Sequence, residues 1–196
     1  MPSPDRQLNA AAEAPGPWRV WLDVPPDWTA DAAGVERALE RLADWPGVAA
    51  ARGELGGLAL EIALAADLIV VDPGTRLRGP GSPHRLAGTP GRLADRLGWG
   101  QAVGFWLDGR GWSARRAATR GLVDAVSGDP VGYAERCLER WSAAGPALPA
   151  LRRLLRAGGR LDESAALALE RAEFALLFSH EDPKAAARAF LARRRR

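Results

Sequence analysis

The chain has 196 residues, which is enough for one domain with a sizeable hydrophobic core. Its net charge of +3 includes the four arginines of the run 193–196, so the rest of the chain carries 3 − 4 = −1. Because this nearly neutral body lacks a basic face, we predict no nucleic-acid partner.

Few histidines and a single cysteine restrict the chemistry further. Cys137 alone rules out an intramolecular disulfide and fits a reducing compartment. His84 and His180 lie far apart in the sequence, so a metal site would need carboxylates, and we predict no metal. The first residues lack a basic region followed by an apolar core, and the apolar stretch 55–71 is short and contains carboxylates. We therefore expect a cytoplasmic protein without a signal peptide or membrane segment.

Strands and short turns dominate the first half of the chain. Residues 1–17 are rich in Pro and Ala without an apolar period, which predicts a disordered leader. Alternation over residues 18–23 predicts a strand with two faces, and a helix follows with apolar residues at steps of four and three. The apolar runs 48–51 and 68–71 predict two further strands, the second covered on both faces.

Helical patterns dominate the second half. One pattern runs from 93 to 107, and Ser113 is predicted to cap a short helix that ends at Gly121. Four more helices are predicted at 133–144, 149–157, 163–178 and 183–195. The chain therefore reads as an α/β core at 18–130 followed by a C-terminal helical region at 131–196.

A loop dense in glycine and proline joins these halves. Residues 75–92 include RGPGSPHRLAGTPGR, which is too rich in these residue types for regular structure. Loops of this kind often line functional sites. Its arginines either meet phosphates or a carboxylate, or form a solvated rim.

One helix carries an unexpected carboxylate. A glycine-rich turn ending at Gly56 and Gly57 separates the strand 48–51 from the helix, and such a turn can hold an oxyanion on backbone N–H groups. Glu61 has apolar neighbours in sequence on every side, which favours a buried position over an exposed one. A buried carboxylate suits general acid or base chemistry.

Four stretches of the sequence together resemble the crotonase superfamily, the enoyl-CoA hydratase and isomerase fold. They are WPGVAAARGELGGLALEIALAADLIV, TPGRLADRLGWGQAVGFWLDGRGWSARRAATRGLVDAV, LERAEFALLFSHED and AAARAFLARR. The resemblance covers more than half of the chain. It implies a shortened, degenerate member, with a crotonase-like ββα spiral core that lacks one strand-loop unit and carries a C-terminal helical extension.

The resemblance also implies a site for an acyl thioester. In the family, two backbone N–H groups hold the thioester oxygen as it becomes an enolate, and each donor contributes about 3 kcal/mol in the transition state. One donor corresponds to the N–H of Leu58, beside Gly57. Glu61 falls on one of two glutamates that hydratases use as acid and base. The second glutamate follows a proline in the family, whereas here Pro80 is followed by Gly81.

Two departures from the family make simple hydration doubtful. Gly81 removes one carboxylate, and the A-D-x-K pattern that carries the second oxyanion donor is missing from the sequence. His84 lies three residues after Gly81 and either replaces the missing acid or base, or is a loop histidine bonded to backbone.

These features leave two functions open. The first is an enzyme acting on an acyl thioester through an enolate-type intermediate, as a lyase, isomerase or decarboxylase, with no cofactor beyond its acyl-CoA or acyl-carrier substrate. The second is a non-catalytic helper or heteromeric partner subunit of another biosynthetic enzyme. The resemblance further implies a homo-oligomer, a trimer or hexamer, or a heteromer with a related enzyme.

Overall fold

The computed structural model describes residues 18–24, 36, 39–40, 42–43, 45–79, 89–145, 147–179 and 185. The predicted leader at 1–17, most of the helix predicted at 183–195, and Pro80, Gly81 and His84 lie outside the described residues. The chain divides into two compact units, Met1–Ser142 and Ala143–Arg196.

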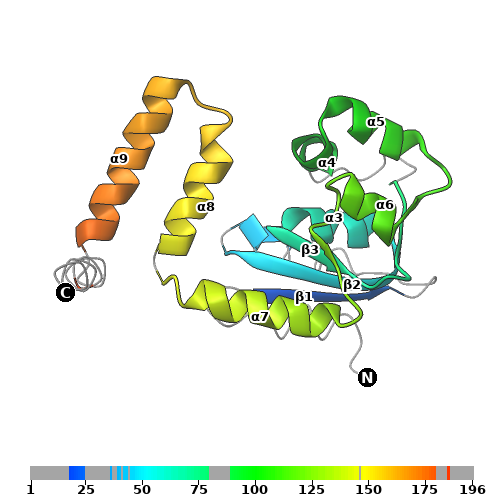
Figure 1. Cartoon of the computed structure of the whole chain (residues 1–196). Helices are drawn as coiled ribbons and strands as arrows, with labels where there is room; N and C mark the ends of the chain where they lie inside the picture. Colours follow the sequence, from blue (N-terminus) through cyan, green and yellow to red (C-terminus); the bar gives the residue numbers. More distant parts are fainter. Residues whose placement is uncertain are drawn as a thin grey trace. The chain divides into compact units, whose positions relative to one another are not determined.

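The first unit combines short strands with helices (Figure 1). In chain order these elements are β1 (Trp18–Val24), β2 (Gly47–Leu55), α3 (Gly57–Ala65), β3 (Leu68–Val71), β4 (Arg76–Leu77), α4 (Thr89–Leu97), α5 (Trp99–Leu107), β5 (Trp112–Ser113), α6 (Ala114–Thr119), β6 (Ala125–Val126) and α7 (Pro130–Ser142). Between β1 and β2, residues 36, 39–40 and 42–43 are helical.

Strand β2 is the centre of the sheet. It pairs in parallel with β1 from Trp18↔Gly47 to Val24↔Gly53, and with β3 from Val48↔Leu68 to Ala51↔Val71. Strand β6 continues the sheet in parallel beside β3. Strand β2 has a neighbouring strand on each edge and helices on both faces. This explains why its residues 48–51 form a continuous apolar run rather than an alternating pattern.

Alternate residues of β2 belong to two different cores. Ala49 and Ala51 pack in the main core with α3, whereas Val48 and Ala50 pack with Ala134 and Cys137 of α7. Because side chains alternate across a strand, α3 and α7 cover opposite faces of the sheet. Figure 1 shows α7 running along the sheet beneath β1 and β2. Helix α7 therefore lies with the first unit, although the sequence grouped residues after 130 with the C-terminal helices.

Strand β4 departs from the loop predicted at 75–92. It pairs in parallel with the last residues of β2, Glu54↔Arg76 and Leu55↔Leu77, and antiparallel with β5. Four residues, 72–75, separate β3 from β4, whereas only residues 52–53 separate the parts of β2 that pair with these two strands. Residues 72–75 form a turn in which Gly74 N–H donates to Asp72 Oδ1 at 2.7 Å. Two paired residues are too few to produce a strand pattern in the sequence.

The helical pattern at 93–107 is two helices rather than one. Helix α4 begins earlier, at Thr89, and ends at Leu97. Gly98 separates it from α5 with φ of +72°, in the left-handed region that glycine adopts without strain. By contrast, the cap predicted at Ser113 is confirmed, because its hydroxyl accepts a hydrogen bond from Arg116 N–H at 3.3 Å at the start of α6.

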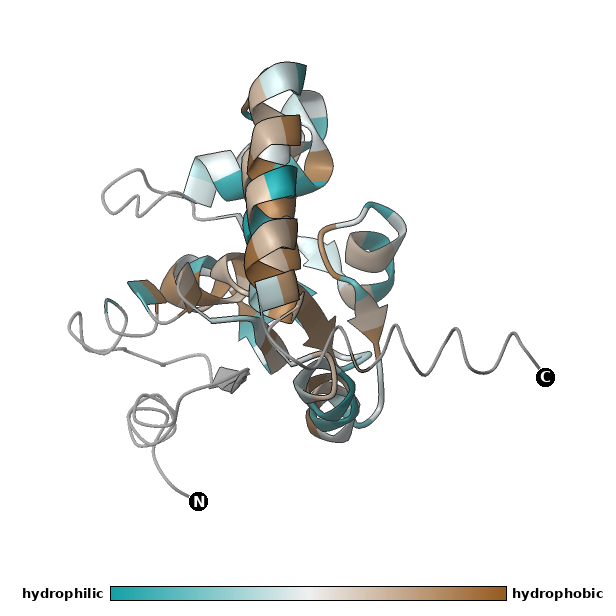
Figure 2. Cartoon of the chain, turned by 90° about the vertical axis from the view of Figure 1, so that its left-hand side faces the viewer, coloured by the Kyte–Doolittle hydropathy of each residue, from teal (hydrophilic) through white to brown (hydrophobic). Residues whose placement is uncertain are grey.

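The second unit is a helical hairpin of α8 (Ala147–Gly158) and α9 (Glu163–Ser179), close to the two helices predicted there. Arg153 joins them through two hydrogen bonds to Glu173, from Nε to Oε1 at 2.6 Å and from Nη2 to Oε2 at 2.7 Å. Large apolar side chains are exposed on both helices, among them Leu155 on α8 and Phe174 on α9. Figure 2, in which α9 stands in front, shows apolar residues among the polar ones along this helix.

Candidate active site at the start of helix α3

Helix α3 is buried on all sides and carries one ionisable residue. Every residue from Ala59 to Ala65 is buried, and Glu61 is 3% exposed. A helix that is apolar all round belongs to a core, so Glu61 is the one carboxylate in an otherwise apolar helix. The structure thus places this carboxylate inside the main core, as its apolar neighbours in the sequence predicted.

Among the described residues, the glycine turn leaves open space at the start of α3. Gly56 caps the helix in an extended conformation, and Gly57 opens it with φ of +50°. A Cβ added to Gly57 would meet no atom within 4 Å among the described residues. The first intrahelical bond of the turn runs from Leu60 N–H to Gly56 O at 3.3 Å. The N–H of Leu58 belongs to the first turn, whose donors have no acceptor within the helix, and it is therefore a candidate donor to an anion.

Leu58 and Glu61 stand on the same side of α3. Residues three apart on a helix are neighbours on its surface, and Cα–Cβ bonds lean toward the helix N-terminus. The Cα–Cβ bond of Glu61 therefore leans toward the first turn of α3, to which the N–H of Leu58 belongs.

The end of β4 lies beside this turn. Arg78 N–H donates to Leu55 O at 3.0 Å, and a Cβ added to Gly56 would lie 3.5 Å from Arg78 Cβ. The chain therefore leaves the sheet next to the N-terminus of α3 and leads, two residues later, to Pro80 and Gly81. The positions of Pro80, Gly81 and His84 lie outside the described residues, so their relation to Glu61 stays a prediction.

Gly79 brings the same segment against helix α5. A Cβ added there would lie 2.7 Å from Phe105 O and 2.9 Å from Trp106 O, both backbone atoms. Such contacts are closer than real Cβ atoms make, so only glycine fits at this crossing. The segment after β4 therefore lies next to both the turn before α3 and the second half of α5.

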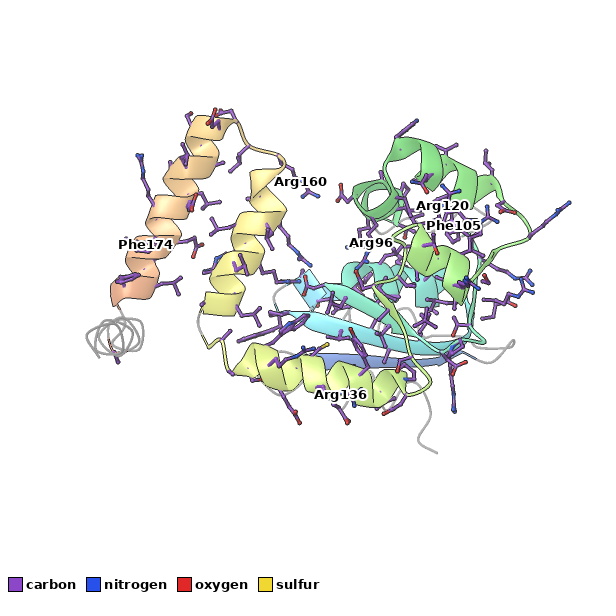
Figure 3. All side chains as sticks on the ribbon, in the orientation of Figure 1. Arg96, Phe105, Arg120, Arg136, Arg160 and Phe174 are labelled. Atoms are coloured by element: carbon purple, nitrogen blue, oxygen red, sulfur yellow. The ribbon has the colours of Figure 1, made fainter. Side chains whose placement is uncertain are left out.

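Arg96 on α4 anchors the other end of α3. Its Nη2 donates to the carbonyls of Ala66 and Asp67, at 3.3 and 3.2 Å, and its Nη1 donates to Asp124 Oδ2 at 2.9 Å. Figure 3 labels Arg96. The sequence did not predict a role for Arg96, because the residues around an arginine on a helix do not indicate which distant carbonyls it contacts. Its contacts hold the end of the helix that positions Glu61.

Helices α4 and α5 enclose an apolar groove of about 230 Å³. Its lining is entirely apolar and comprises Pro90, Leu93, Trp99, Val103, Trp106 and Leu107 together with two alanines. Trp99 and Leu107 are largely exposed, at 79% and 77%. Nothing in the sequence indicated that two of its tryptophans, Trp99 and Trp106, would line a groove.

Within the described ranges, no group of three or more His, Cys, Asp or Glu residues is placed to hold a metal ion. None of the helices in the described part of the chain is long and apolar enough to cross a membrane.

Comparison with known proteins decides the family. No protein-family model matches the chain. An enoyl-CoA hydratase from Amycolatopsis orientalis is 38% identical over 125 residues, which cover 62% of this chain and 56% of that protein. The structure of enoyl-CoA hydratase subunit I from Geobacillus kaustophilus matches with a TM-score of 0.71 and 28% identity over 82% of this chain and 64% of that one. The chain belongs to the crotonase superfamily.

The crotonase fold extends over nearly the whole chain. A candidate enoyl-CoA hydratase/isomerase from Mycobacterium abscessus matches 97% of this chain and 85% of its own, with a TM-score of 0.76 and 24% identity. The predicted fold class, a crotonase-like α/β core in shortened form, is confirmed. The chain nevertheless spans less than two thirds of the Amycolatopsis and Geobacillus proteins, at 56% and 64% of their lengths.

Proposed function

We propose that this crotonase-like chain binds an acyl-CoA thioester and stabilises its enolate at the start of α3. The observation that carries the proposal is the buried carboxylate of Glu61, three residues after Leu58 on the same helix. The names of the two relatives that span part of this chain, both enoyl-CoA hydratases, support an acyl-CoA substrate. The reaction uses the thioester alone and no further cofactor.

The proposed chemistry begins with proton abstraction. Glu61 takes a proton from the carbon next to the thioester carbonyl, and the C–H electron pair moves to form a C=C bond while the C=O pair moves onto oxygen. The Leu58 N–H holds the resulting oxyanion, which is worth about 3 kcal/mol for a well-placed donor. Returning the proton to a different carbon isomerises the substrate, and loss of a leaving group from the next carbon completes an elimination.

A lyase, isomerase or decarboxylase reaction fits the residues better than hydration. In a decarboxylation, the C–CO2 bond next to the thioester carbonyl breaks, its electron pair forms the enolate as CO2 leaves, and protonated Glu61 then gives a proton to that carbon. Hydration requires one group to activate water and another to deliver a proton, and Gly81 stands where the family has its second glutamate. Isomerisation needs only one base that also acts as the acid. His84 is the candidate for a second proton-transfer group.

Hydrogen–deuterium exchange tests the proposal without knowledge of the final product. Acetyl-CoA in D2O should exchange its methyl protons in the presence of the protein, as followed by NMR. Glu61→Gln should lower the exchange rate by about 10²- to 10⁴-fold, because it removes the base. Glu139→Gln changes an exposed carboxylate on α7 in the same way and should leave the rate unchanged. Equal exchange rates for wild type and Glu61→Gln would remove Glu61 from the proposal.

The second candidate function is a helper or partner subunit, and the exposed apolar residues of the α8–α9 hairpin favour it. Leu151, Leu155, Phe174 and Leu176 are all more than half exposed. Surfaces of this kind mark protein–protein contacts. Mass measurement of the purified chain, alone and with a catalytic homologue, distinguishes the candidates: a self-contained assembly with its own exchange activity favours the enzyme.

A further inference from the structure

Arg78 is a cation beside the turn that begins α3. A Cβ added to Gly56 would lie 3.5 Å from Arg78 Cβ and 3.8 Å from Arg78 O. The turn is open to solvent, because Gly57 is exposed and Leu58 is half-buried, and the side chain of Arg78 is itself 54% exposed. Arg78 therefore combines a backbone fixed next to the proposed oxyanion donor with a charged group that a ligand from solution can reach.

The backbone and the first carbons of the Arg78 side chain are held by close packing. Its N–H donates to Leu55 O at 3.0 Å. A Cβ added to Gly111 would lie 3.0 Å from Arg78 Cγ and 2.7 Å from Leu77 O, and the φ of Gly111 is +67°. A side chain at position 111 would thus collide with both β4 and the stem of Arg78. Glycine at this position leaves the room through which the Arg78 side chain passes.

The charges around Arg78 favour an anionic ligand. Its Nε lies 2.9 Å from Glu54 Oε1, and the two side chains are 54% and 44% exposed. Exposed ion pairs contribute little free energy, so a ligand carboxylate can join or replace Glu54 at small cost. A guanidinium has five N–H donors in a planar fork, more than one carboxylate contact uses. Two further exposed arginines add positive charge, Arg76 on the same strand and Arg110 beside Gly111.

We propose that Arg78 recognises a carboxylate at the far end of the acyl group, which makes dicarboxylic acyl thioesters the substrate class. This inference rests on the proposed function, in which the Leu58 N–H holds the thioester oxygen. The recognised carboxylate is one that stays on the substrate. An ion pair with a departing carboxylate would weaken as its charge moves to the thioester oxygen, and it would stabilise the substrate more than the transition state. A remote carboxylate keeps its contact with Arg78 throughout isomerisation or elimination.

Deuterium exchange of glutaryl-CoA and pentanoyl-CoA in D2O tests this role, because the two acyl groups have the same number of carbons and differ only at the far end. In wild type, kcat/KM for glutaryl-CoA should exceed that for pentanoyl-CoA by about 3- to 10-fold. Arg78→Gln should abolish this preference mainly by raising the KM for glutaryl-CoA, since the ion pair is the same in the substrate and in the transition state. Arg136→Gln is the matched control at an exposed arginine of α7, and it should keep the preference.

Glu54→Gln distinguishes recognition of a ligand from a merely structural ion pair. Without Glu54 the guanidinium of Arg78 is left to the substrate, so the preference for glutaryl-CoA should rise by about twofold. Arg78→Gln should change the preference in the opposite direction. If the pair only held the end of β4 in place, the two substitutions would change the kinetics in the same direction, and the inference would fail.

The outcomes separate this inference from the proposed function. Equal kcat/KM for both thioesters in wild type would overturn the role of Arg78 and leave the proposed function intact. An equal loss for both thioesters in Arg78→Gln would also overturn it, because the arginine would then contact the phosphates of CoA. Exchange of neither thioester by wild type would overturn the proposed chemistry. In that case, calorimetric binding of glutaryl-CoA that depends on Arg78 would still support the carboxylate site, and binding that does not depend on it would overturn the site as well.

Discussion

Arg96 and Asp124 join the end of helix α3 to the strand that closes the sheet. Asp124 Oδ2 accepts a hydrogen bond from Arg96 Nη1 at 2.9 Å and another from Ile69 N–H at 2.6 Å. Arg96 also donates to the carbonyls of Ala66 and Asp67. One arginine therefore connects α4, the end of α3 and the segment before β6.

Removing the Arg96 guanidinium should destabilise the first unit. Arg96→Ala leaves two carbonyls and a carboxylate without their shared donor, and we expect a loss of about 2 kcal/mol in the free energy of unfolding. Urea denaturation measures the change. Arg115→Ala, at an exposed position on α6, should change the free energy by less than about 0.5 kcal/mol. An equal effect of the two substitutions would show that the Arg96 contacts contribute no stability.

Gly79 and Gly104 should respond in opposite directions to alanine. Gly79→Ala forces a Cβ to within 2.7 Å of Phe105 O, and the required backbone shift should cost about 1–3 kcal/mol. Gly104→Ala on helix α5 adds a Cβ that meets no atom of the described residues within 4 Å, and it should stabilise the protein by about 0.5–1 kcal/mol. Thermal unfolding of the two variants measures both changes. A Gly79→Ala protein as stable as wild type would mean that the crossing of β4 and α5 is looser than the structure shows.

The backbone donor of Leu58 can be removed while the helix is retained. Leu58→Pro eliminates the N–H in the first turn of α3, where proline is tolerated, and should lower deuterium exchange of acetyl-CoA by about 10²- to 10³-fold. Leu58→Ala shortens the side chain but keeps the N–H, and it should retain most of the exchange activity. Circular dichroism verifies that both variants fold. If the alanine variant loses as much activity as the proline variant, the side chain of Leu58 matters and its N–H does not.

The α8–α9 hairpin should be sensitive to acid through Glu173. Hydrogen bonds from Arg153 hold the pKa of the Glu173 carboxyl below its ordinary value of 4.5. The unfolded chain therefore binds this proton at a higher pH than the folded chain, and the stabilising contribution is complete above pH 4.5 and is lost as the pH falls through the lowered pKa.

Urea denaturation near neutral pH and at about pH 3 measures this contribution. Wild type should lose more stability on acidification than Glu173→Gln, which has no carboxyl to protonate at this position. Glu170→Gln, at an exposed position on α9, should retain the pH dependence of wild type. Identical acid sensitivity of wild type and Glu173→Gln would contradict the role of the Arg153–Glu173 pair.

The sequence by itself determined the elements that depend on local patterns. Strand β3 matches the predicted run 68–71, and the cap at Ser113 matches because a hydroxyl and the N–H three residues later are neighbours in any helix start. The burial of Glu61 followed from apolar neighbours along the chain, and the family followed from four ordered motifs. Each of these patterns lies within a short stretch of the chain, so each can be recognised in a single sequence.

Only the tertiary structure decided the features that depend on distant contacts. The pairing of Arg76–Leu77 with β2 and the hydrogen bonds of Arg96 to Ala66, Asp67 and Asp124 all join residues far apart in the chain. Gly79 is one of many glycines in the sequence, and only the backbone of α5 shows why that position needs one. Local pattern determines which residues form a helix or strand, whereas the choice of neighbour depends on packing and hydrogen bonds that no short window of sequence contains.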